Sequence, residues 1–531
     1  MKIFLQSAIA LSLIVIAMPL YAADFSVAVI DGKKISGSQA IQKFYTERNG
    51  QFLWVSDNEL TSDAKDIVKD IGDSWKHGLN PLNYHYNDIT QYAKNGVPKG
   101  RETEIEILFS DAVIRYGQDL SGMRLSPRLL GEDTTSWSRG VDGYSLLTIL
   151  SETNNRDRFL RQLLPQDETY QRLSEELTAI AEDLAKNPEK DLKKLKYPGL
   201  LKPGMVNPAI VTIRQKLGAS GKSDIYDEKL KKDVEDFQSR HGLAADGLIG
   251  QRSFDAINQT RTQKLVKLIA NLERRRWVRR PMPSRYVVVN IPQMQLQAFE
   301  DSKVAFEMPV IIGRDSRPTN SFVDEIIGVR FNPLWYVPDT IKTQDYLPAL
   351  RKDPRALDKK GIQFRVKDEN GFKKISPSDI DWSKISEQDL KHIQMYQDSG
   401  DENSLGLIRV LMPNQYDIYL HDTNAPELFK KDDRALSSGC VRMSEPSRMA
   451  NFILGSNQGW DSKKIETYIA SHKLIEVKAE QPLSVYLLYY TAWLDQKDRV
   501  IIANDVYGND AKLVQALQEK GKIPFDLKIL R

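Results

Sequence analysis

Apolar residues recur with a helical period in the first third of the chain. Ile67, Val68, Ile71 and Trp75 are spaced as on one face of a helix, and the helix breakers GLNP follow them. Segments of this kind alternate with polar connections as far as about residue 187. The pattern predicts an N-terminal helical scaffold domain, which we place at residues 23–190.

Two further amphipathic segments follow a charged connector. They are PAIVTIRQKLG and YDEKLKKDVEDFQSRHGLAADGLIG, and the second carries an apolar stripe of Leu230, Val234 and Phe237 before the turn Asp246-Gly247. Segments this short bury their stripes only against each other. We therefore expect a small helical bundle at residues 195–260.

The period changes from helical to two near Arg285. Met294, Leu296 and Ala298 alternate with glutamines, and KVAFEMPVIIG follows a turn near Asp301, which indicates a hairpin. A second hairpin is expected from LIRVLM and YDIYLH on either side of Pro413-Asn414. A β-rich domain is predicted over residues 284–531.

Two parts of this β-rich domain have a different character. Residues 343–403 are charged, with helical signals and few core positions, so we expect a lid inserted between the halves of the sheet. Residues 478–531 return to strand-like composition and are expected to complete the domain. The predicted fold class is multidomain α+β: a helical scaffold, a small helical bundle and a β-rich domain with an inserted lid.

The N-terminus has the pattern of an export signal. Lys2 precedes an apolar run from Ala8 to Leu20 that ends in YAAD. The run is short for a helix that must cross roughly 30 Å of hydrocarbon. We predict a signal peptide at residues 1–22 and a periplasmic mature protein, with association with the inner membrane as the alternative if the signal is not cleaved.

Composition adds little about partners. The chain has 531 residues, with 75 Lys plus Arg against 72 Asp plus Glu, so its length predicts several domains and its net charge gives no field that would attract nucleic acid. We interpret the arginines of ERRRWVRR as a solvated helix end that packs against the next domain. His77 and His85 make a weak ligand set, so no metal and no cofactor are expected.

The chain contains a single cysteine, Cys440, and export would leave its thiol without a disulfide partner inside the chain. It is either a nucleophile or a small buried apolar residue. Ser437, Ser438 and Gly439 are small, so a carbonyl group can approach and backbone N–H groups can face a developing oxyanion. The spacing favours His421, at the end of a strand, as the base, and does not exclude His472.

At these residues the sequence resembles a known family. HDT followed by SSGCVRM is similar to the active-site signature of the YkuD-like L,D-transpeptidase catalytic domain, and IIGRDSRPTNS and FNPLWYVP extend the match. The earlier segment with FQ, HGL and DG resembles a helical peptidoglycan-binding module. The whole layout is similar to the large YcbB-type members. Asp422 stands where the family usually has glycine, and Ser438 where it usually has histidine.

The resemblance implies roles for individual residues. It implies that Cys440 is the nucleophile and His421 the base, which a backbone carbonyl or a serine hydroxyl would orient. Ser438, Gly439 and Arg442 are expected to hold the oxyanion or position the substrate, and Trp335 and Tyr416 to line the donor groove.

The resemblance also implies a reaction. Cys440 would attack the amide between diaminopimelate and the terminal D-alanine of a tetrapeptide stem, and the thioester would acylate the diaminopimelate amine of a second stem. The expected partners are donor and acceptor stems, carbapenem β-lactams as covalent inhibitors, and other wall-synthesis enzymes. The alternatives are L,D-carboxypeptidase or D-amino-acid exchange through the same thioester, and a wall-binding scaffold without catalysis.

Overall fold

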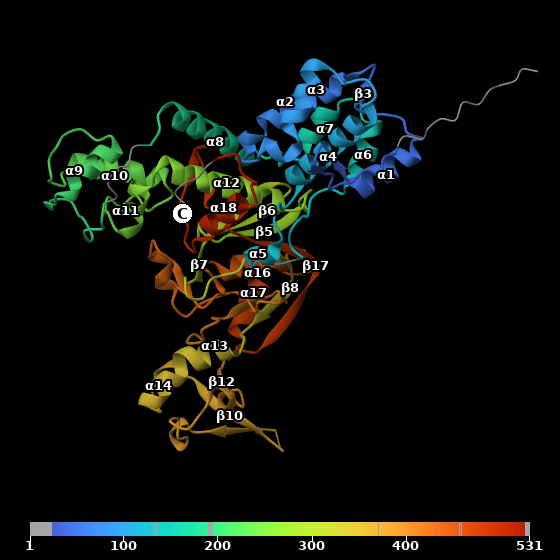
Figure 1. Ribbon diagram of the computed structural model, residues 1–531. Coiled ribbons are helices and arrows are strands. Elements are labelled where there is room, and N and C mark those ends of the chain that lie inside the picture. The colour runs from blue at the N-terminus through green and yellow to red at the C-terminus, as the bar shows by residue number, and fades with distance from the viewer. Residues whose placement is uncertain are drawn as a thin grey trace, which may run out of the picture. The chain divides into compact units, whose positions relative to one another are not determined.

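The computed structural model describes residues 24–131, 133, 135–189, 195–369, 371–455, 457 and 459–525 (Figure 1). The expected signal peptide lies outside these residues. None of the helices within them has the length and hydropathy needed to cross a bilayer. The chain folds as two compact units, the first made of the segments up to Gly72, Pro81–Gly117 and Val141–Leu160, and the second of the remainder.

The first unit is mainly helical, as its apolar period predicts. Ile67, Val68 and Ile71 are all buried on one face of α2. Glu106 of α4 is also buried, and desolvation raises its pKa to about 7 although its carboxylate accepts hydrogen bonds from backbone N–H groups of Trp54 and Val55. The main elements of this unit are α1 (Ser38–Glu47), α2 (Ser62–Asp73), α3 (Tyr86–Asn95), α4 (Glu102–Ser121), α6 (Gly143–Glu152), β1 (Val29–Ile30), β2 (Lys33–Lys34), β3 (Val55–Ser56) and β4 (Glu59–Leu60).

The second unit is built around a nine-stranded sheet in the order β15-β7-β16-β14-β13-β8-β17-β5-β6. Strand β7 also pairs with β6, so the sheet closes on itself around an apolar core that α16 (Pro446–Leu454) covers. The fold class is therefore mixed α+β, as predicted. The strands are β5 (Arg285–Asn290), β6 (Gln295–Glu300), β7 (Lys303–Gly313), β8 (Phe322–Phe331), β13 (Ile408–Leu411), β14 (Leu420–His421), β15 (Ala435–Ser437), β16 (Val441–Met443) and β17 (Ile475–Leu488).

One of the two expected hairpins forms in full. Strands β6 and β7 pair across a turn in which Asp301 and Ser302 have positive φ. The second hairpin is reduced to a single pair, Arg409 with His421. Here the Asn414 side chain bonds four backbone groups, those of Met412, Tyr416 and twice Ile418, and so replaces the strand ladder.

The arginines of ERRRWVRR are solvated only in part, since Arg279 and Arg280 are exposed and the others are buried or half-buried. They lie at the end of α12 (Arg261–Trp277), where Arg276 is buried against Glu273 and Arg274 is buried against Asp510 of α18 (Asn509–Glu519). The expectation that this helix end packs against the next domain is confirmed by the Arg274–Asp510 pair. The expectation of solvation was wrong for Arg274 and Arg276, because a charge run carries no sign of which of its members are buried.

The inserted segment has more structure than its composition indicated. Its sheet has the order β11-β10-β12-β9, and Leu350, Phe364, Trp382 and Met395 are among the residues of its own core. The expectation of little core was wrong because the apolar residues stand singly among charged ones. We refer to residues 335–397 as the lid. Its elements are β9 (Trp335–Tyr336), α13 (Asp339–Ile341), η3 (Lys342–Tyr346), α14 (Leu347–Lys352), β10 (Gln363–Asp368), β11 (Gly371–Ile375), α15 (Glu387–Leu390) and β12 (Ile393–Gln397).

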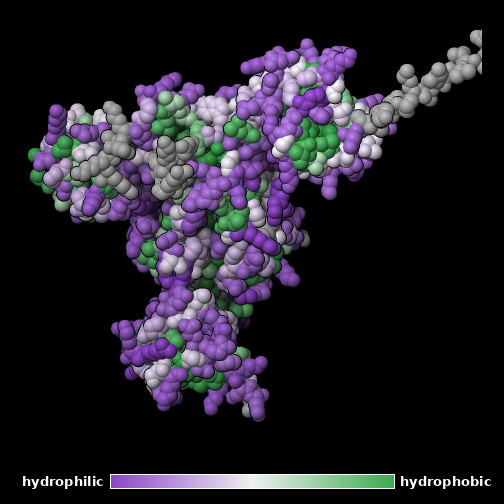
Figure 2. All heavy atoms as spheres, viewed as in Figure 1, coloured by the Kyte–Doolittle hydropathy of each residue, from purple (hydrophilic) through white to green (hydrophobic). Residues whose placement is uncertain are grey.

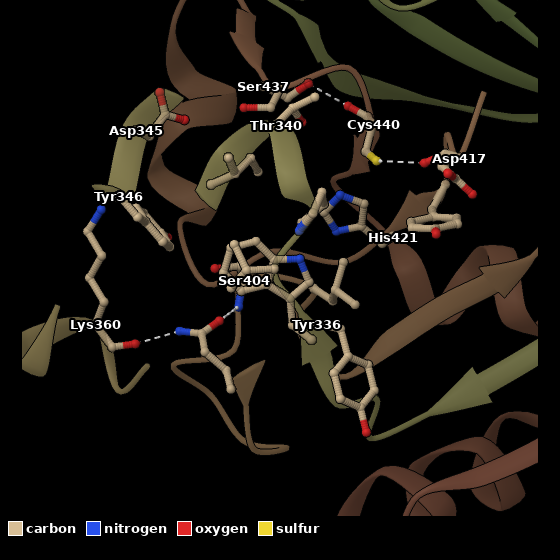
Figure 3. A pocket seen from close by; sticks show the side chains of 18 of the residues that line it. Tyr336, Thr340, Asp345, Tyr346, Lys360, Ser404, Asp417, His421, Ser437 and Cys440 are labelled. Carbon is tan, nitrogen blue, oxygen red and sulfur yellow. Dashed lines mark hydrogen bonds between the residues drawn. The ribbon is translucent and has the colours of Figure 1, made fainter. Parts of the chain in front are cut away.

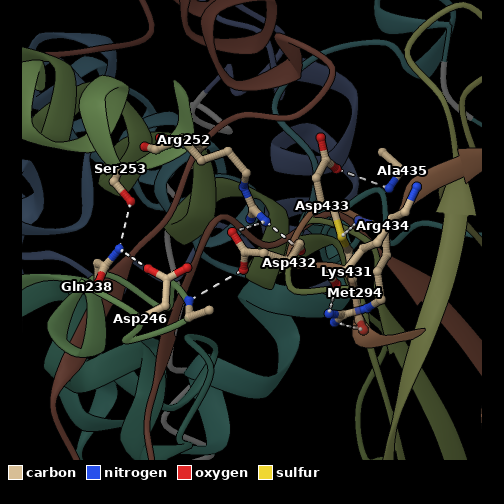
Figure 4. A network of polar contacts seen from close by, with 12 residues as sticks. Gln238, Asp246, Arg252, Ser253, Met294, Lys431, Asp432, Asp433, Arg434 and Ala435 are labelled. Atoms are coloured by element: carbon tan, nitrogen blue, oxygen red, sulfur yellow. Dashed lines mark hydrogen bonds and ion pairs between the residues drawn. The ribbon is translucent and has the colours of Figure 1, made fainter. Parts of the chain in front are cut away.

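The small helical bundle consists of α9 (Ala209–Leu217), α10 (Glu228–Arg240) and α11 (Gln251–Asn258), with Leu230 and Val234 in its core. Phe237 is only partly buried. The Gln238 side chain is buried instead and holds the Asp246-Gly247 turn by bonds to Gly247 N and Leu248 O. Figure 4 shows its further bonds to Asp246 and Ser253. Further elements of the second unit are α5 (Pro127–Leu130), α8 (Glu168–Lys186), α17 (Ser462–Ala470), β18 (Ala492–Leu494) and β19 (Val500–Ile502).

Candidate active site

A cavity of about 960 Å³ lies between the strands around β14 and the base of the lid (Figure 3). Six of the seven residues expected at the site line it, and Gly439 is the exception. The six are Trp335, Tyr416, His421, Ser438, Cys440 and Arg442. Trp335 also packs against the lid core, and Tyr416 against the core of the main sheet.

Strand register brings Cys440 and His421 to the same face of the sheet. Strands β14 and β16 are parallel, with Leu420 opposite Val441 and His421 opposite Arg442. Leu420 and Val441 are fully buried in the core, so their neighbours on each strand face the other way, into the cavity. Figure 3 shows the Cys440 sulfur and the His421 ring on the same side of that cavity.

The turn before Cys440 is held by hydroxyl groups. Ser437 Oγ donates to the Cys440 carbonyl at 2.6 Å and accepts from the Gly439 N–H at 3.1 Å. Thr319 Oγ1 donates to the Gly439 carbonyl at 2.7 Å, and Gly439 has a φ of +117°, a conformation that favours glycine. Within the described part of the chain, the N–H groups of Ser438 and Cys440 have no acceptor.

His421 lies in a row of guanidinium groups. Arg409 on β13 and Arg442 on β16 are its register partners on either side. The Nε atoms of both arginines are buried without a hydrogen-bond partner, and neither guanidinium has a carboxylate within ion-pair distance in the described chain. Arg409 instead lies over the Tyr419 ring, 3.6 Å from its centroid.

Burial and these arginines keep the imidazole neutral. Desolvation, followed by the charge of Arg442, lowers the pKa of His421 to about 3. The backbone of Asp422 and of Leu405 opposes this shift, and Nδ1 is buried without a hydrogen-bond partner. At neutral pH the ring is therefore able to accept a proton.

The thiol of Cys440 is also neutral at rest. Burial raises its pKa, while the backbone of Tyr419 and the charges of Arg409 and Arg442 lower it. Its Sγ lies 3.7 Å from the Asp417 carbonyl. The pair is a thiol beside an imidazole rather than a preformed thiolate and imidazolium.

The two residues that depart from the family signature have structural roles. Asp422 accepts hydrogen bonds from the N–H groups of Leu407 and Thr423, and its carboxyl group fills the space beside Gly406. Ser438 Oγ is bonded to Arg317 at 3.1 Å. Arg317 in turn makes two bonds to Asp345 in η3, at 2.7 and 3.0 Å, and so joins the turn before Cys440 to the base of the lid.

Sequence reasoning missed three residues of the site. Tyr419 stands two residues before His421, so period two alone indicated that both side chains share a face. Arg409 and Arg317 carried no such signal, because their positions depend on strand register and on the place of the lid.

The structure brings together no metal-ligand set: no cluster of three or more His, Cys, Asp or Glu suited to a metal ion is present in the described ranges. His85 is bonded to Asp111 at 2.8 Å, and His77 to Ser174 at 3.2 Å.

Three family models match the chain. They are "L,D-transpeptidase catalytic domain" (YkuD) at residues 284–502, "Putative peptidoglycan binding domain" at residues 207–257 and "Scaffold domain" at residues 39–177.

A curated protein of Haemophilus influenzae, named "Putative L,D-transpeptidase", is 32% identical over 247 residues, which are 46% of this chain and 48% of that protein. The chain thus spans about half the length of this curated relative.

Two solved structures share much less sequence. An L,D-transpeptidase (Yku) from Stackebrandtia nassauensis is 12% identical over 54% of this chain and 94% of its own, with a TM-score of 0.21. The Ldtfm–avibactam carbamoyl enzyme is 9% identical over 39% of this chain and 51% of its own, with a TM-score of 0.18. TM-scores this low carry no structural argument.

The conclusion comes from the family models and the curated relative. Residues 284–502 are an L,D-transpeptidase catalytic domain of the YkuD family, in a chain that also contains a scaffold domain and a peptidoglycan-binding domain.

Proposed function

We propose that this protein is a periplasmic L,D-transpeptidase that joins the third-position diaminopimelate residues of two peptidoglycan stems. The observation that carries the proposal is the placement of Cys440 and His421 on one sheet face inside one cavity. The substrates are a tetrapeptide stem as donor and a second stem as acceptor.

The first half-reaction forms a thioester. Cys440 Sγ attacks the carbonyl carbon of the diaminopimelate–D-alanine amide while His421 takes the thiol proton. The C–N bond then breaks, and the imidazolium delivers its proton to the leaving amine of D-alanine. The N–H groups of Ser438 and Cys440 hold the oxyanion, whereas the Gly439 N–H is engaged with Ser437.

The second half-reaction uses the same base. The acceptor amine attacks the thioester carbonyl, the C–S bond breaks, and His421 passes the amine proton to sulfur. The imidazolium that forms in each half-reaction is disfavoured beside two guanidinium groups. A substrate carboxylate bound by Arg442 offsets that charge, which gives the unpaired guanidinium a role in positioning the substrate.

Hydrolysis and D-amino-acid exchange share the thioester, so products decide between them. Muropeptide mass spectrometry on purified tetrapeptide substrates is expected to show 3–3 dimers and released D-alanine. Tripeptides without dimers would establish a carboxypeptidase instead.

The catalytic pair is tested by substitution. Cys440→Ala is expected to form no dimers, and His421→Ala to fold but to give no carbapenem adduct at Cys440 in intact-mass spectra. A folded Cys440→Ala protein with parental dimer yield would rule out the nucleophile, and a wall-binding scaffold would show neither adduct nor dimer in the parent.

A further inference from the structure

The outer face of the lid sheet carries six side chains that the lid core does not use, and of these six Tyr336 alone lines the catalytic cavity. Phe364 on β10 pairs with Met395 on β12, and both are buried in the lid core, so their neighbours along each strand face outward. The outward residues are Tyr336, Gln363, Arg365, Phe372, Gln394 and Tyr396.

Arg365 is fixed at the centre of this outer face. Its guanidinium carbon lies 4.2 Å from the ring centroid of Phe372, 4.7 Å from that of Tyr396 and 5.6 Å from that of Tyr336. Nε donates to Gln394 Oε1 at 2.5 Å and Nη2 to the Tyr336 hydroxyl at 3.3 Å. Within the described residues, Nη1 has no partner and no carboxylate forms an ion pair with this arginine.

A guanidinium held in this way is prepared for an anion. Its orientation is set by three rings and two acceptors before any ligand arrives, so little conformational entropy remains to be lost on binding. A solvated surface arginine without a ligand needs no such support.

Aromatic surface and positive charge extend on both sides of Arg365. Tyr336 is 44% exposed and Phe372 is 54% exposed, although large apolar side chains are usually buried. Lys367 and Lys374 add two exposed cations, and the carboxylate on this face, Asp398, is hydrogen-bonded by Gln363. Figure 2 shows hydrophobic residues among hydrophilic ones on the lid.

The outer face is continuous with the catalytic cavity. Tyr336 lines the cavity that contains Cys440 and also supports Arg365. Its neighbour Trp335 points to the opposite side of β9 and packs against the lid core. If a side group of a polymer enters the cavity, the adjoining part of that polymer therefore lies against the outer face of the lid sheet.

We propose that the outer face of the lid sheet binds the peptidoglycan strand whose stem peptide occupies the cavity. Sugar rings stack on the exposed Phe372 and Tyr336, and a carboxylate of a neighbouring stem pairs with Arg365. The identity of the ligand rests on the proposed function, whereas the binding of an anionic, ring-containing polymer follows from the rings and cations of the face.

Binding is measured apart from catalysis. In a Cys440→Ala background, fluorescence anisotropy with soluble, uncross-linked peptidoglycan strands bearing tetrapeptide stems gives the Kd. Arg365→Gln and Phe372→Ala are each expected to weaken binding by about tenfold, the scale of one stacked ring or one charge-assisted contact. Lys352→Gln on α14, which removes a lid cation away from this face, is the matched control and is expected to keep the parental Kd.

Several results would overturn the proposal. These are a parental Kd in both Arg365→Gln and Phe372→Ala, an equal loss in Lys352→Gln, or equal affinity for single-stranded DNA of the same charge. A different result would contradict the proposed function, namely the absence of a carbapenem adduct at Cys440 in the parent protein. The affinity for peptidoglycan strands could still be measured in that case.

Discussion

The imidazole of His421 is enclosed by cations that do not neutralise one another. Arg409 and Arg442 are its neighbours across the sheet, and neither has a carboxylate partner in the described chain. The role of base proposed for His421 needs a neutral ring at rest, and this arrangement keeps the ring neutral but lowers stability in acid. Below the ordinary histidine pKa the unfolded chain takes up a proton that the native state refuses.

This cost predicts how unfolding depends on pH. The pKa of His421 falls from about 6.5 in the unfolded chain to about 3 in the native state. As the pH is lowered from about 6.5 to about 3, the free energy of unfolding therefore drops by about 1.4 kcal/mol per pH unit. His421→Asn removes this contribution. Urea unfolding should therefore show that the free energy of unfolding falls by about 2 to 3 kcal/mol less between pH 7.5 and pH 4.5 in the variant than in the parent. The exposed His392, changed to Asn, is the control. Equal losses in the parent and in His421→Asn would refute the explanation.

At the scale of elements, the base of the lid and the catalytic turn are one connected structure. Arg317 bonds both Asp345 in η3 and Ser438 near Cys440. The side chain of Arg317 is 11% exposed and that of Asp345 is 37% exposed, so solvent reaches the pair from the Asp345 side. Movement of the lid at η3 therefore acts on the turn that carries Cys440.

Arg317→Gln is expected to slow acylation of Cys440 by a carbapenem about tenfold, because small displacements of a nucleophile cost one to two orders of magnitude in rate. Arg317→Gln and Asp345→Asn should be non-additive in a double-mutant cycle, since they remove the same interaction. Arg314→Gln is the control, because the Arg314 guanidinium lies 3.6 Å from Asp345 without contacting Ser438. Additive effects, or equal slowing in Arg314→Gln, would contradict the link.

Local pattern predicted the elements that local physics determines. The hairpin near Asp301, the helical faces around Ile67 and the side-chain alternation that places His421 in the cavity all follow from periods of two or 3.6. The lid core and the partners of Arg274 and Arg317 could not be predicted from these periods, because each depends on contacts between residues far apart in the sequence. The same limit explains why His421 was found from its position at a strand end, whereas Arg409 was not.

Within the second unit, the helical bundle makes contacts with the catalytic domain near the segment that leads to Cys440. Arg252 of α11 donates to the Asp432 carbonyl at 2.7 Å, and Ala244 N lies 3.4 Å from the Asp432 carboxylate (Figure 4). Asp432 is followed by β15 and the turn before Cys440. The bundle thus restrains the start of the catalytic loop.

A substitution at Gly242 tests whether packing of the bundle against the catalytic domain affects that domain. A Cβ at this position would lie 2.9 Å from side-chain carbons of Trp493 on β18 and Ile501 on β19, so in Gly242→Ala either these side chains or the bundle must shift. Gly242 has a φ of +65° and Gly218 one of +69°, but a Cβ at Gly218 meets open space. Gly218→Ala is therefore the matched control for backbone strain, which costs about 1 to 2 kcal/mol in either variant.

Hydrogen exchange separates the two effects. Gly242→Ala should raise exchange in residues 492–502 and around Ala244. On the proposed function, with the bundle as the peptidoglycan-binding domain, it should also lower cross-linking of intact sacculi more than carbapenem acylation. Gly218→Ala should lose stability without faster exchange in that hairpin. If both variants leave residues 492–502 protected as in the parent, the bundle contact has no influence on the catalytic domain, and the restraint on the loop before Cys440 must come from the sheet alone.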